Sequence, residues 1–458
     1  MINFSSYRKL YENTPTPLKN TIRLIPFRYV AGKTYRDTMN ELTKYRNAST
    51  IEMKKKQEAL LGRTLGFAVK NIPAYMHLEG VIKELRPFEA LLCFPVIDKK
   101  FLQDNFELLV PHKLETQNFY VSTTGGTSGN QLKIVNDNNS HYRETAFIHD
   151  MWRQKIGYNT SHKKATFRGV LFSNIDFKER FWQTNPIYNE LQFSPFHMNT
   201  ENLEKYVARL IKYGPAYLHG YPSAIGTVAK FINSSYKQNP LSKLRGVLLG
   251  SESLSEKQHS EIAKWLGTEV FTWYGQSERI ILAEKCRQKF IYSANPLYGF
   301  TEIIDPTDTQ QNNTITGELV GTSFYNFAMP LIRYRTGDLA EYITAPCNCC
   351  WCDTKITNIQ GRWLQDYIVG HNGSKITSTA LNMHGTIFEN VVRYQYMQNK
   401  PGTVSINLMV NQHFDETDFQ KIYSVYNDKL MNAINFQLKI VEDIPLTPRG
   451  KVKLIKRI

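Results

Sequence analysis

The chain has few cysteines and no apolar segment long enough to span a bilayer. Only six cysteines occur among 458 residues, and four of them are crowded between Cys347 and Cys352. This distribution does not resemble the spaced framework of a disulfide-rich secreted domain. No apolar run approaches the ~20 residues of a transmembrane helix. The first residues also lack the basic, apolar and small-residue succession of a signal peptide, so we expect a cytoplasmic protein.

Internal repeats, low-complexity tracts and known RNA- or DNA-binding motifs are also lacking, so the sequence does not predict a nucleic-acid partner. Lys and Arg number 56 against 41 Asp and Glu, a net charge of +15. Such a surplus can attract anionic lipids or substrates, although a basic, solvated surface is the simpler interpretation. Residues 18–28 are apolar and basic and could contact a membrane surface peripherally, but Pro26 interrupts any long helix there.

The length predicts at least two domains. Residues 1–110 are expected to form a mostly helical lead-in, interrupted at Ile72-Pro73 and Arg86-Pro87. Strands at 165–172 and 246–249 then alternate with helices, which indicates an α/β core. The expected helices cover residues 201–212, 223–232 and 256–265.

A change of pattern near residue 290 predicts a β-rich subdomain over residues 290–345. Its expected strands cover residues 291–292, 300–304, 318–322 and 340–343. A boundary near residue 361 separates a small α+β unit. The predicted fold is therefore α/β: a large N-terminal domain over 1–360, which includes the β-rich subdomain, and a mobile C-terminal lid over 361–458.

A glycine- and hydroxyl-rich loop follows the apolar run at 119–121. Its residues are Ser122, Thr123, Thr124, Gly125, Gly126, Thr127, Ser128 and Gly129. The backbone N–H groups of such a loop can wrap a polyphosphate. The loop lacks the Lys-Ser/Thr ending of the common P-loop, and a plain turn is the alternative interpretation.

Four further motifs follow in order. They are Trp-Tyr-Gly-Gln-Ser-Glu at 273–278, Pro-Leu-Ile-Arg-Tyr-Arg-Thr-Gly-Asp at 330–338, Gly-Arg at 361–362 with Asp366, and Pro-Leu-Thr-Pro-Arg-Gly-Lys-Val at 445–452. This series resembles the adenylate-forming superfamily of acyl- and aryl-CoA ligases. Within it the chain is similar to the phenylacetate–CoA ligase branch and to CapK-like proteins of capsular polysaccharide biosynthesis. Residues 35–36, 72–75 and 220–223 also resemble that subgroup, so the resemblance covers essentially the whole chain.

The resemblance implies a role for each motif. Activating a carboxylate with ATP requires a phosphate cradle, a divalent metal and a cation near the α-phosphate. The glycine loop would hold the phosphates, Glu278 would ligate Mg²⁺, and Asp338 would bind the ribose hydroxyls. Lys451 would reach the α-phosphate and the substrate carboxylate, and Arg362 would lie at the hinge of the lid.

The same resemblance implies the rest of the site. The expected adenine slot and its motif comprise Gly250, Ser251, Glu252, Tyr274, Gly275, Gln276 and Ser277. The expected acyl pocket comprises His219, Gly220, Tyr221, Pro222 and Trp273. The chain departs from the family pattern at Gln131, where proline is usual, and at 363–365, where at least one residue is extra.

The implied reaction forms an acyl-adenylate and pyrophosphate, after which the acyl group passes to coenzyme A as the lid rotates. Three alternatives remain: an amine acceptor on a sugar or amino acid, adenylyl transfer to a coenzyme, and a nucleotide-binding scaffold without catalysis. Relatives of this kind are often dimers, so a homodimer is a further implication of the resemblance.

The cysteine cluster predicts a structural zinc ion. Thiolates at this spacing can ligate zinc, although adjacent cysteines rarely complete one tetrahedral site. The favoured ligands are Cys286, Cys347, Cys349 and Cys352. Cys286 enters through the resemblance, and Cys350 is the alternative to Cys352. Tyr292 stands where many relatives have a histidine, and reduced, unliganded thiols are the competing interpretation.

Overall fold

The computed structural model describes the greater part of the chain. The described residues are 25–112, 119–123, 132–169, 181–198, 200–307, 314–343, 354–361, 367–381, 383, 386–388, 390–430, 432–445 and 454–457. Within these ranges no helix is both long and apolar enough to cross a membrane.

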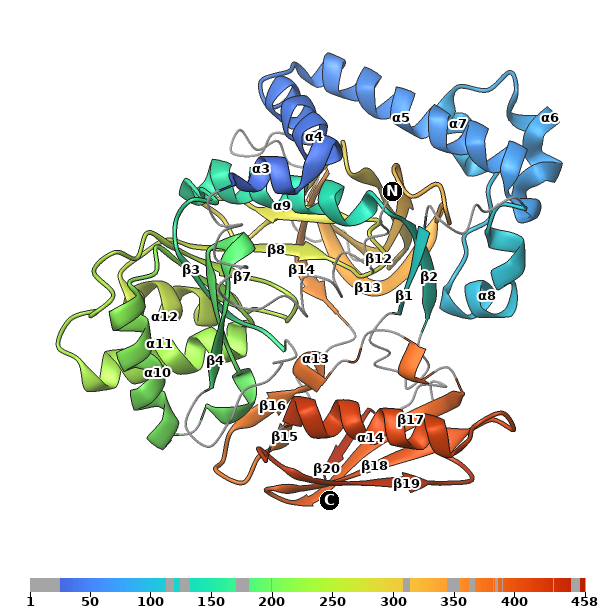
Figure 1. Ribbon diagram of the computed structural model, residues 1–458. Coiled ribbons are helices and arrows are strands. Elements are labelled where there is room, and N and C mark those ends of the chain that lie inside the picture. The colour runs from blue at the N-terminus through green and yellow to red at the C-terminus, as the bar shows by residue number, and fades with distance from the viewer. Residues whose placement is uncertain are drawn as a thin grey trace.

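The first described residues form a helical layer along the upper edge of the molecule (Figure 1). Its helices are α3 (Phe27–Val30), α4 (Gly32–Tyr45), α5 (Thr50–Asn71), α6 (Glu79–Ile82) and α7 (Pro87–Leu92), with a 3-10 turn at Pro73–Leu78. Below them, at the right of that view, lies α8 (Lys99–Asp104), which is followed by a 3-10 turn at Phe106–Leu109. A capping box between Ser49 and Glu52 starts α5. The helix ends before Ile72-Pro73, and α7 begins at Pro87, so both predicted interruptions are confirmed.

A twelve-stranded sheet forms the centre, in the order β11-β12-β13-β14-β10-β9-β8-β7-β6-β3-β5-β4. Its parallel half contains β3 (Lys164–Phe167), β5 (Glu190–Phe193), β6 (Tyr217–Gly220), β7 (Gly246–Leu249) and β8 (Val270–Gly275), with β4 (Trp182–Asn185) antiparallel at the edge. The associated helices are α9 (Ser140–Ile156), α10 (Thr200–Tyr213), α11 (Pro222–Ser235) and α12 (Glu256–Leu266). The three predicted helices of this region are confirmed, and the first predicted strand is shorter than expected because it ends at Phe167.

The antiparallel half of the sheet follows directly. It contains β9 (Leu282–Lys285), β10 (Tyr292–Ala294), β11 (Gly299–Thr307), β12 (Thr314–Ser323), β13 (Tyr334–Ile343) and β14 (Lys355–Gln360). The predicted β-rich stretch is therefore part of the same continuous sheet. A separate two-stranded hairpin joins β1 (Phe119–Thr123) to β2 (Lys133–Asp137).

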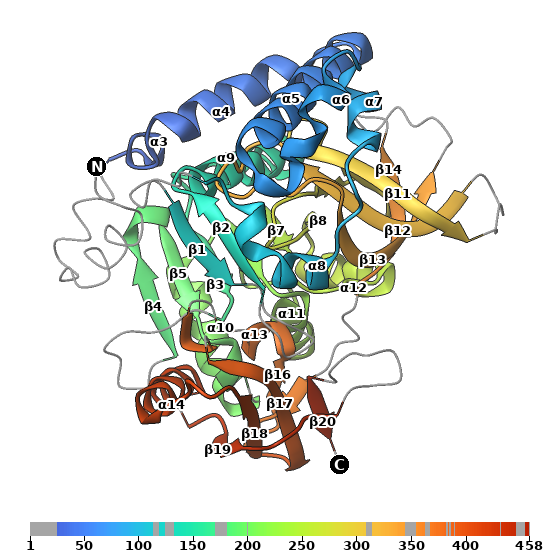
Figure 2. The same ribbon diagram turned by 90° about the vertical axis from the view of Figure 1, so that its right-hand side faces the viewer.

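The C-terminal residues form a smaller unit at the bottom of both views (Figure 2). It contains the hairpin β15 (Tyr367–Val369)–β16 (Lys375–Thr377), α13 (Ser378–Leu381), the 3-10 turn Thr386–Phe388, β17 (Val391–Lys400), β18 (Thr403–Val410), α14 (Glu416–Leu430), β19 (Asn435–Ile440) and β20 (Ile455–Arg457). Strands β19-β18-β17-β20 form its four-stranded sheet. The α/β fold class is confirmed.

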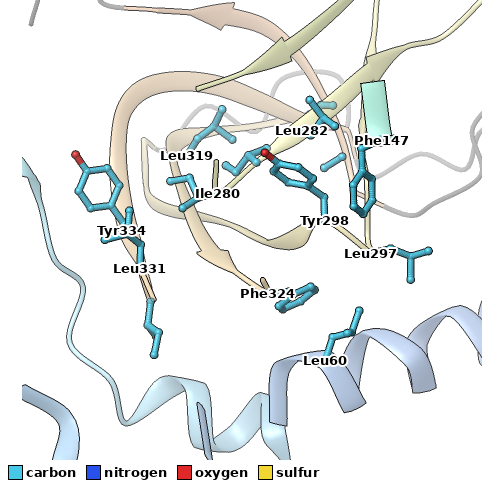
Figure 3. Close-up of a cluster of buried hydrophobic side chains, with 14 of the residues drawn as sticks. Leu60, Phe147, Ile280, Leu282, Leu297, Tyr298, Leu319, Phe324, Leu331 and Tyr334 are labelled. Atoms are coloured by element: carbon cyan, nitrogen blue, oxygen red, sulfur yellow. The ribbon is translucent and has the colours of Figure 1, made fainter. Parts of the chain in front are cut away.

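Two hydrophobic cores lie on opposite faces of the parallel strands. The first joins Leu60 of α5 and Phe147 of α9 to Ile280, Leu319 and Phe324 of the antiparallel region (Figure 3). The second lies beneath α10–α12 and continues into the C-terminal unit. Since parallel strands are usually covered on both faces, this two-core arrangement leaves their carboxyl edge as the place for a site.

Gly220 tests how tightly the end of β6 is packed. A Cβ at this position would lie 2.4 Å from the carbonyl oxygen of Phe167 on β3. We expect Gly220→Ala to lower the free energy of unfolding by about 3 kcal/mol, because backbone must move to admit it. Gly226→Ala is the control: its nearest contact would be an ordinary 3.8 Å to Ile262, so a gain of roughly 0.5–1 kcal/mol is expected. Denaturant unfolding compares them, and equal stabilities would contradict the packing argument.

Candidate active site

The described part of the glycine loop lies at the end of β1. Ser122 and Thr123 pair with Ile134 and Lys133 of β2. Asn136 Nδ2 donates to Ser122 Oγ at 2.7 Å, which fixes the hydroxyl at the loop entrance. The loop residues 124–129 lie outside the described residues.

Tyr274 and Asp338, taken from two different motifs, meet directly. The hydroxyl of Tyr274 donates to Asp338 Oδ2 at 2.7 Å, and Gln276 Nε2 donates to the same hydroxyl at 2.7 Å. Gln276 Oε1 in turn accepts from the backbone N–H of Ile281. Burial and the Asp338 carboxylate raise the pKa of Tyr274, so its proton stays in place. Two motifs 64 residues apart therefore form one hydrogen-bonded group.

A bulge in β13 places Asp338 in this group. Glu318 of β12 pairs with Leu339 and Val320 pairs with Arg335, so residues 336–338 face a single residue of β12. Gly337 has a φ of +74°, a conformation in which a side chain is strained. Its N–H donates to Glu318 Oε1 at 3.0 Å. Bulges of this kind redirect a side chain beside a site.

Arg279 is a site residue that the sequence analysis missed. It follows Glu278 in the turn after β8, and its side chain contacts three other elements. Its Nε donates to Glu144 Oε2 of α9 at 2.6 Å, and its Nη1 donates to the Tyr120 hydroxyl at 2.6 Å and to Asn136 Oδ1 at 3.0 Å. Because Asn136 also holds Ser122, Arg279 links the glycine-loop hairpin to the turn that carries Glu278.

Arg279 has an uncommon backbone conformation and a guanidinium that stays charged although it is largely buried. Its φ of +56° is uncommon for a residue with a side chain, and its contacts hold it there. Burial alone would lower the pKa of Arg279, but the neighbouring Glu144 and Tyr120 raise it above its ordinary value. The guanidinium therefore stays charged. Its place beside the Trp-Tyr-Gly-Gln-Ser-Glu motif was the one available signal in the sequence.

The predicted acyl-pocket residues divide between two faces of the sheet. His219 lies against Trp152 and Trp273, with ring centroids 5.0 and 6.0 Å away. Gly250 lies under the Trp273 indole, whose Cζ2 is 2.8 Å from where a Cβ would stand. Tyr221 instead accepts a hydrogen bond from the Gly169 N–H at 3.2 Å and packs in the second core.

The other predicted pocket and motif residues lie at the ends of strands or just after them. Gly220 ends β6, and Pro222 begins α11 directly after Tyr221. Gly275 ends β8. Ser277 and Glu278 lie in the following turn, where the Arg279 N–H donates to the carbonyl of Gln276.

Ser251 and Glu252, predicted near the adenine, lie where the large sheet meets the C-terminal unit. We call this contact, which includes Glu252 and Thr377, the seam. Glu252 Oε1 accepts from the Thr377 hydroxyl at 2.7 Å, and Oε2 accepts from the Ser223 N–H at 3.1 Å. Ser251 has a φ of +69° and accepts from Arg168 Nη2. Glu252 therefore joins the large sheet to the end of β16.

Several predicted residues lie outside the described residues: Arg362, Asp366, Lys451, Cys347, Cys349 and Cys352. Cys286 is described and buried after β9, and its N–H donates to the carbonyl of Ile291. The register Lys285–Tyr292–Ile356 places Cys286 about three residue rows and two strands from Thr354, roughly 14 Å. The predicted zinc set therefore requires residues 344–353 to fold back toward Cys286. No cluster of three His, Cys, Asp or Glu side chains suited to a metal occurs among the described residues.

Comparisons with known proteins show what the chain is similar to. Residues 368–458 match the family model of the CapK C-terminal domain. The curated Protein CapK of Staphylococcus aureus is 26% identical over 367 residues, which cover 78% of each chain. This chain is a CapK homologue.

Solved structures extend the likeness of this CapK homologue to its fold. A 2-hydroxyisobutyryl-CoA ligase, in complex with 2-HIB-AMP and CoA in its thioesterification state, aligns with a TM-score of 0.51 and 15% identity. The alignment covers 90% of this chain and 91% of that one. The same ligase in its postadenylation state aligns with a TM-score of 0.47. The alignment with the thioesterification-state structure shows that this chain has the two-domain fold of acyl-CoA ligases.

Arg279→Lys should weaken the link between the hairpin and the turn. Lysine keeps the charge but loses the fork that contacts Glu144, Tyr120 and Asn136 together. We expect the free energy of unfolding to fall by about 3 kcal/mol and amide exchange in β1 to accelerate. Hydrogen-exchange mass spectrometry measures the second effect. The control is Arg287→Lys, whose guanidinium contacts only the carbonyls of Gln154 and Lys155 among the bonds described for it. Unchanged β1 protection in Arg279→Lys would contradict the link.

The seam carries a pH dependence. Burial raises the pKa of Glu252, opposed by its bonds to Thr377 and Ser223. The contribution of the Glu252 carboxyl to the free energy of unfolding is therefore fully present at a pH below its pKa in the unfolded chain. It is lost as the pH rises through its higher pKa in the folded protein. Glu252→Gln does not ionise, so it should raise the Tm at pH 7 and change it little at pH 4. Calorimetry between pH 4 and 8 tests this, with Glu261→Gln, in the middle of α12, as control. A lower Tm at pH 7 in Glu252→Gln would contradict the assignment.

Proposed function

We propose that the protein activates a carboxylic acid with ATP to an acyl-adenylate and then transfers the acyl group to an acceptor. The observation that carries the proposal is the convergence of separate motifs. Tyr274 binds Asp338, and Arg279 ties the turn of Glu278 to the strand that enters the glycine loop. A nucleotide bound along this edge would have its ribose near Asp338 and its phosphates near Ser122.

In the first half-reaction a carboxylate oxygen attacks the α-phosphorus of ATP. The new P–O bond gives the acyl-adenylate, and the bond to the β-phosphate oxygen breaks to release pyrophosphate. Lys451 is proposed to meet the charge that develops at the α-phosphate. Glu278 is proposed as the ligand of a Mg²⁺ ion, which would neutralise phosphate charge. The partly buried carboxylate of Glu278, in a turn fixed by Arg279, is of the hard-oxygen type that Mg²⁺ prefers.

The second half-reaction is proposed to transfer the acyl group to a thiol, with coenzyme A as the first candidate. The thiol sulfur attacks the acyl carbon, loses its proton, and AMP leaves. The solved 2-hydroxyisobutyryl-CoA ligase, in complex with 2-HIB-AMP and CoA in the thioesterification state, supports this order. Arg362, near the predicted boundary, is proposed to serve the lid rotation between the steps.

An amine acceptor on a sugar or amino acid is the second candidate for this step. It is favoured by the similarity to the Protein CapK of S. aureus together with the resemblance, noted from the motifs, to CapK-like proteins of capsular polysaccharide biosynthesis. Adenylyl transfer to a coenzyme would leave AMP on the product and is distinguished by that mass.

Zinc remains a structural proposal for the same protein. Cys286, Cys347, Cys349 and Cys352 have the donor chemistry of a thiolate site. Zinc would join the antiparallel half of the sheet to the loop before β14 and takes no part in the reaction. Peripheral membrane association, a homodimer and a cytoplasmic location are likewise proposals.

Lys451→Ala tests the first half-reaction. With ATP, Mg²⁺, hydroxylamine as a trap and a panel of aryl, fatty, hydroxy and amino acids, pyrophosphate should be released with at least one acid. Because a cation at the α-phosphate acts in the transition state, the substitution should lower that rate by about 100-fold or more. Lys453→Ala, in the same basic segment, is the control and should retain the rate. Equal loss in both variants, or release that does not depend on any acid, would contradict the proposal.

A further inference from the structure

Three aromatic rings meet at the carboxyl edge of the parallel strands, on the face covered by α9. The ring centroids of Trp152 and His219 are 5.0 Å apart, and those of Trp152 and Trp273 are 5.4 Å apart. The register pairs His219 with Leu248, and Leu248 with Phe271, so all three point to this face. Trp273 lies two residues beyond Phe271 on the same face. Ligands of α/β sheets bind at this edge.

Two polar atoms in this group lack partners. His219 Nδ1 and Trp152 Nε1 are both buried and have no hydrogen-bond partner within the described part of the chain. The two residues are only 7% and 3% exposed. Leaving a buried donor or acceptor unpaired destabilises a protein, so each such atom requires an explanation. Two of them on rings in contact indicate a bound group that supplies both bonds.

The chemistry of these atoms limits what that group can be. Burial, together with Lys164 and Arg168, lowers the pKa of His219 well below its ordinary value, so the imidazole is neutral. A neutral imidazole offers a lone pair on one ring nitrogen, whereas an indole N–H only donates. A hydroxyl is the common group that can accept from the indole and donate to the imidazole at the same time.

The same rings limit the length of the ligand. The Trp273 indole covers Gly250, with Cζ2 2.8 Å from where a Cβ would stand. Leu248 and Phe271 close the face behind the rings, and both are buried in the first core. An acid whose hydroxyl reached these rings would therefore have Trp273, packed over Gly250, on one side and the first core on the other, which favours a short chain.

We infer that the acid activated by this protein is a short-chain hydroxy acid, whose hydroxyl accepts from Trp152 Nε1–H and donates to His219 Nδ1. This inference rests on the proposed function and names its substrate class. It makes His219 and Trp152 specificity-determining residues, and it makes Trp273 the wall that excludes longer acids.

The experiment pairs acids that differ only by the hydroxyl. Acid-dependent pyrophosphate release is measured with 2-hydroxyisobutyrate against isobutyrate and with 3-hydroxybutyrate against butyrate, and octanoate tests length. Calorimetric binding of the same acids to the whole protein provides a readout that does not need turnover. The variants are His219→Phe, which keeps a ring without polar atoms, and His219→Asn, whose amide keeps a polar atom near Nδ1. Trp182→Phe on β4 is the control for altering an aromatic residue elsewhere.

In the native protein, kcat/KM for at least one hydroxy acid should exceed that of the matching acid without the hydroxyl by ~10-fold or more. This preference should fall to about onefold in His219→Phe and persist in His219→Asn and Trp182→Phe. Trp273→Ala should admit octanoate.

Three outcomes would overturn the inference. They are equal rates for each pair, a preference for octanoate in the native protein, and a preference unchanged in His219→Phe. The first two leave acid adenylation itself intact. Absence of pyrophosphate release with every acid would reject the proposed function, and calorimetry would then decide the inference: hydroxy-acid binding that His219→Phe abolishes supports it, and equal or absent binding of each pair contradicts it.

Discussion

The candidate site depends on one guanidinium. Arg279 contacts α9 through Glu144, β1 through Tyr120 and β2 through Asn136, so one planar group is bonded to three segments that lie 135 to 159 residues before it in sequence. A lysine could pair with only one of these partners in the same way, because its ammonium lacks the fork. The ion pair with Glu144 keeps the guanidinium charged, and the charge in turn orders the phenol and amide around it. Among the described residues the hairpin that enters the glycine loop pairs with no other strand, so Arg279 positions it together with Asn326, whose side chain bonds to Val135 and Asp137 of β2.

A second constraint comes from the change of strand direction within one sheet. Strands β3, β5, β6, β7 and β8 run parallel, and β9 then pairs antiparallel with β8. The turn between β8 and β9 holds Gln276, Glu278 and Arg279, so it lies where the two halves of the sheet meet. Asp338 reaches the same place from β13 by way of a bulge. Side chains from both halves can therefore converge on a ligand at this edge, which neither half could surround alone.

Local signals made the fold predictable and left the site only partly so. Helix starts such as Ser49–Glu52 and breaks such as Ile72-Pro73 act over a few residues, and the structure follows them. The motif residues Tyr274 and Asp338 could be named as candidates because each motif is continuous in sequence. Arg279 was missed because its partners lie 135 to 159 residues away, and nothing near it in sequence reveals them. The placement of Glu252 at the seam depends on Thr377, 125 residues later, for the same reason.

The seam itself is suited to being broken and remade. Besides apolar packing, its described bonds are few and polar: Glu252 with Thr377, and the Ser374 hydroxyl with the carbonyl of Phe196 at 3.0 Å. Water can replace each partner when the units separate, so no charge or donor is left buried and unpaired. Gly169 permits the close approach, because a Cβ there would lie 2.8 Å from the carbonyl oxygen of Ala380. A seam made of exchangeable bonds and a missing side chain holds the C-terminal unit in one position without fixing it there, which suits the lid rotation that the proposed two-step acyl transfer would need.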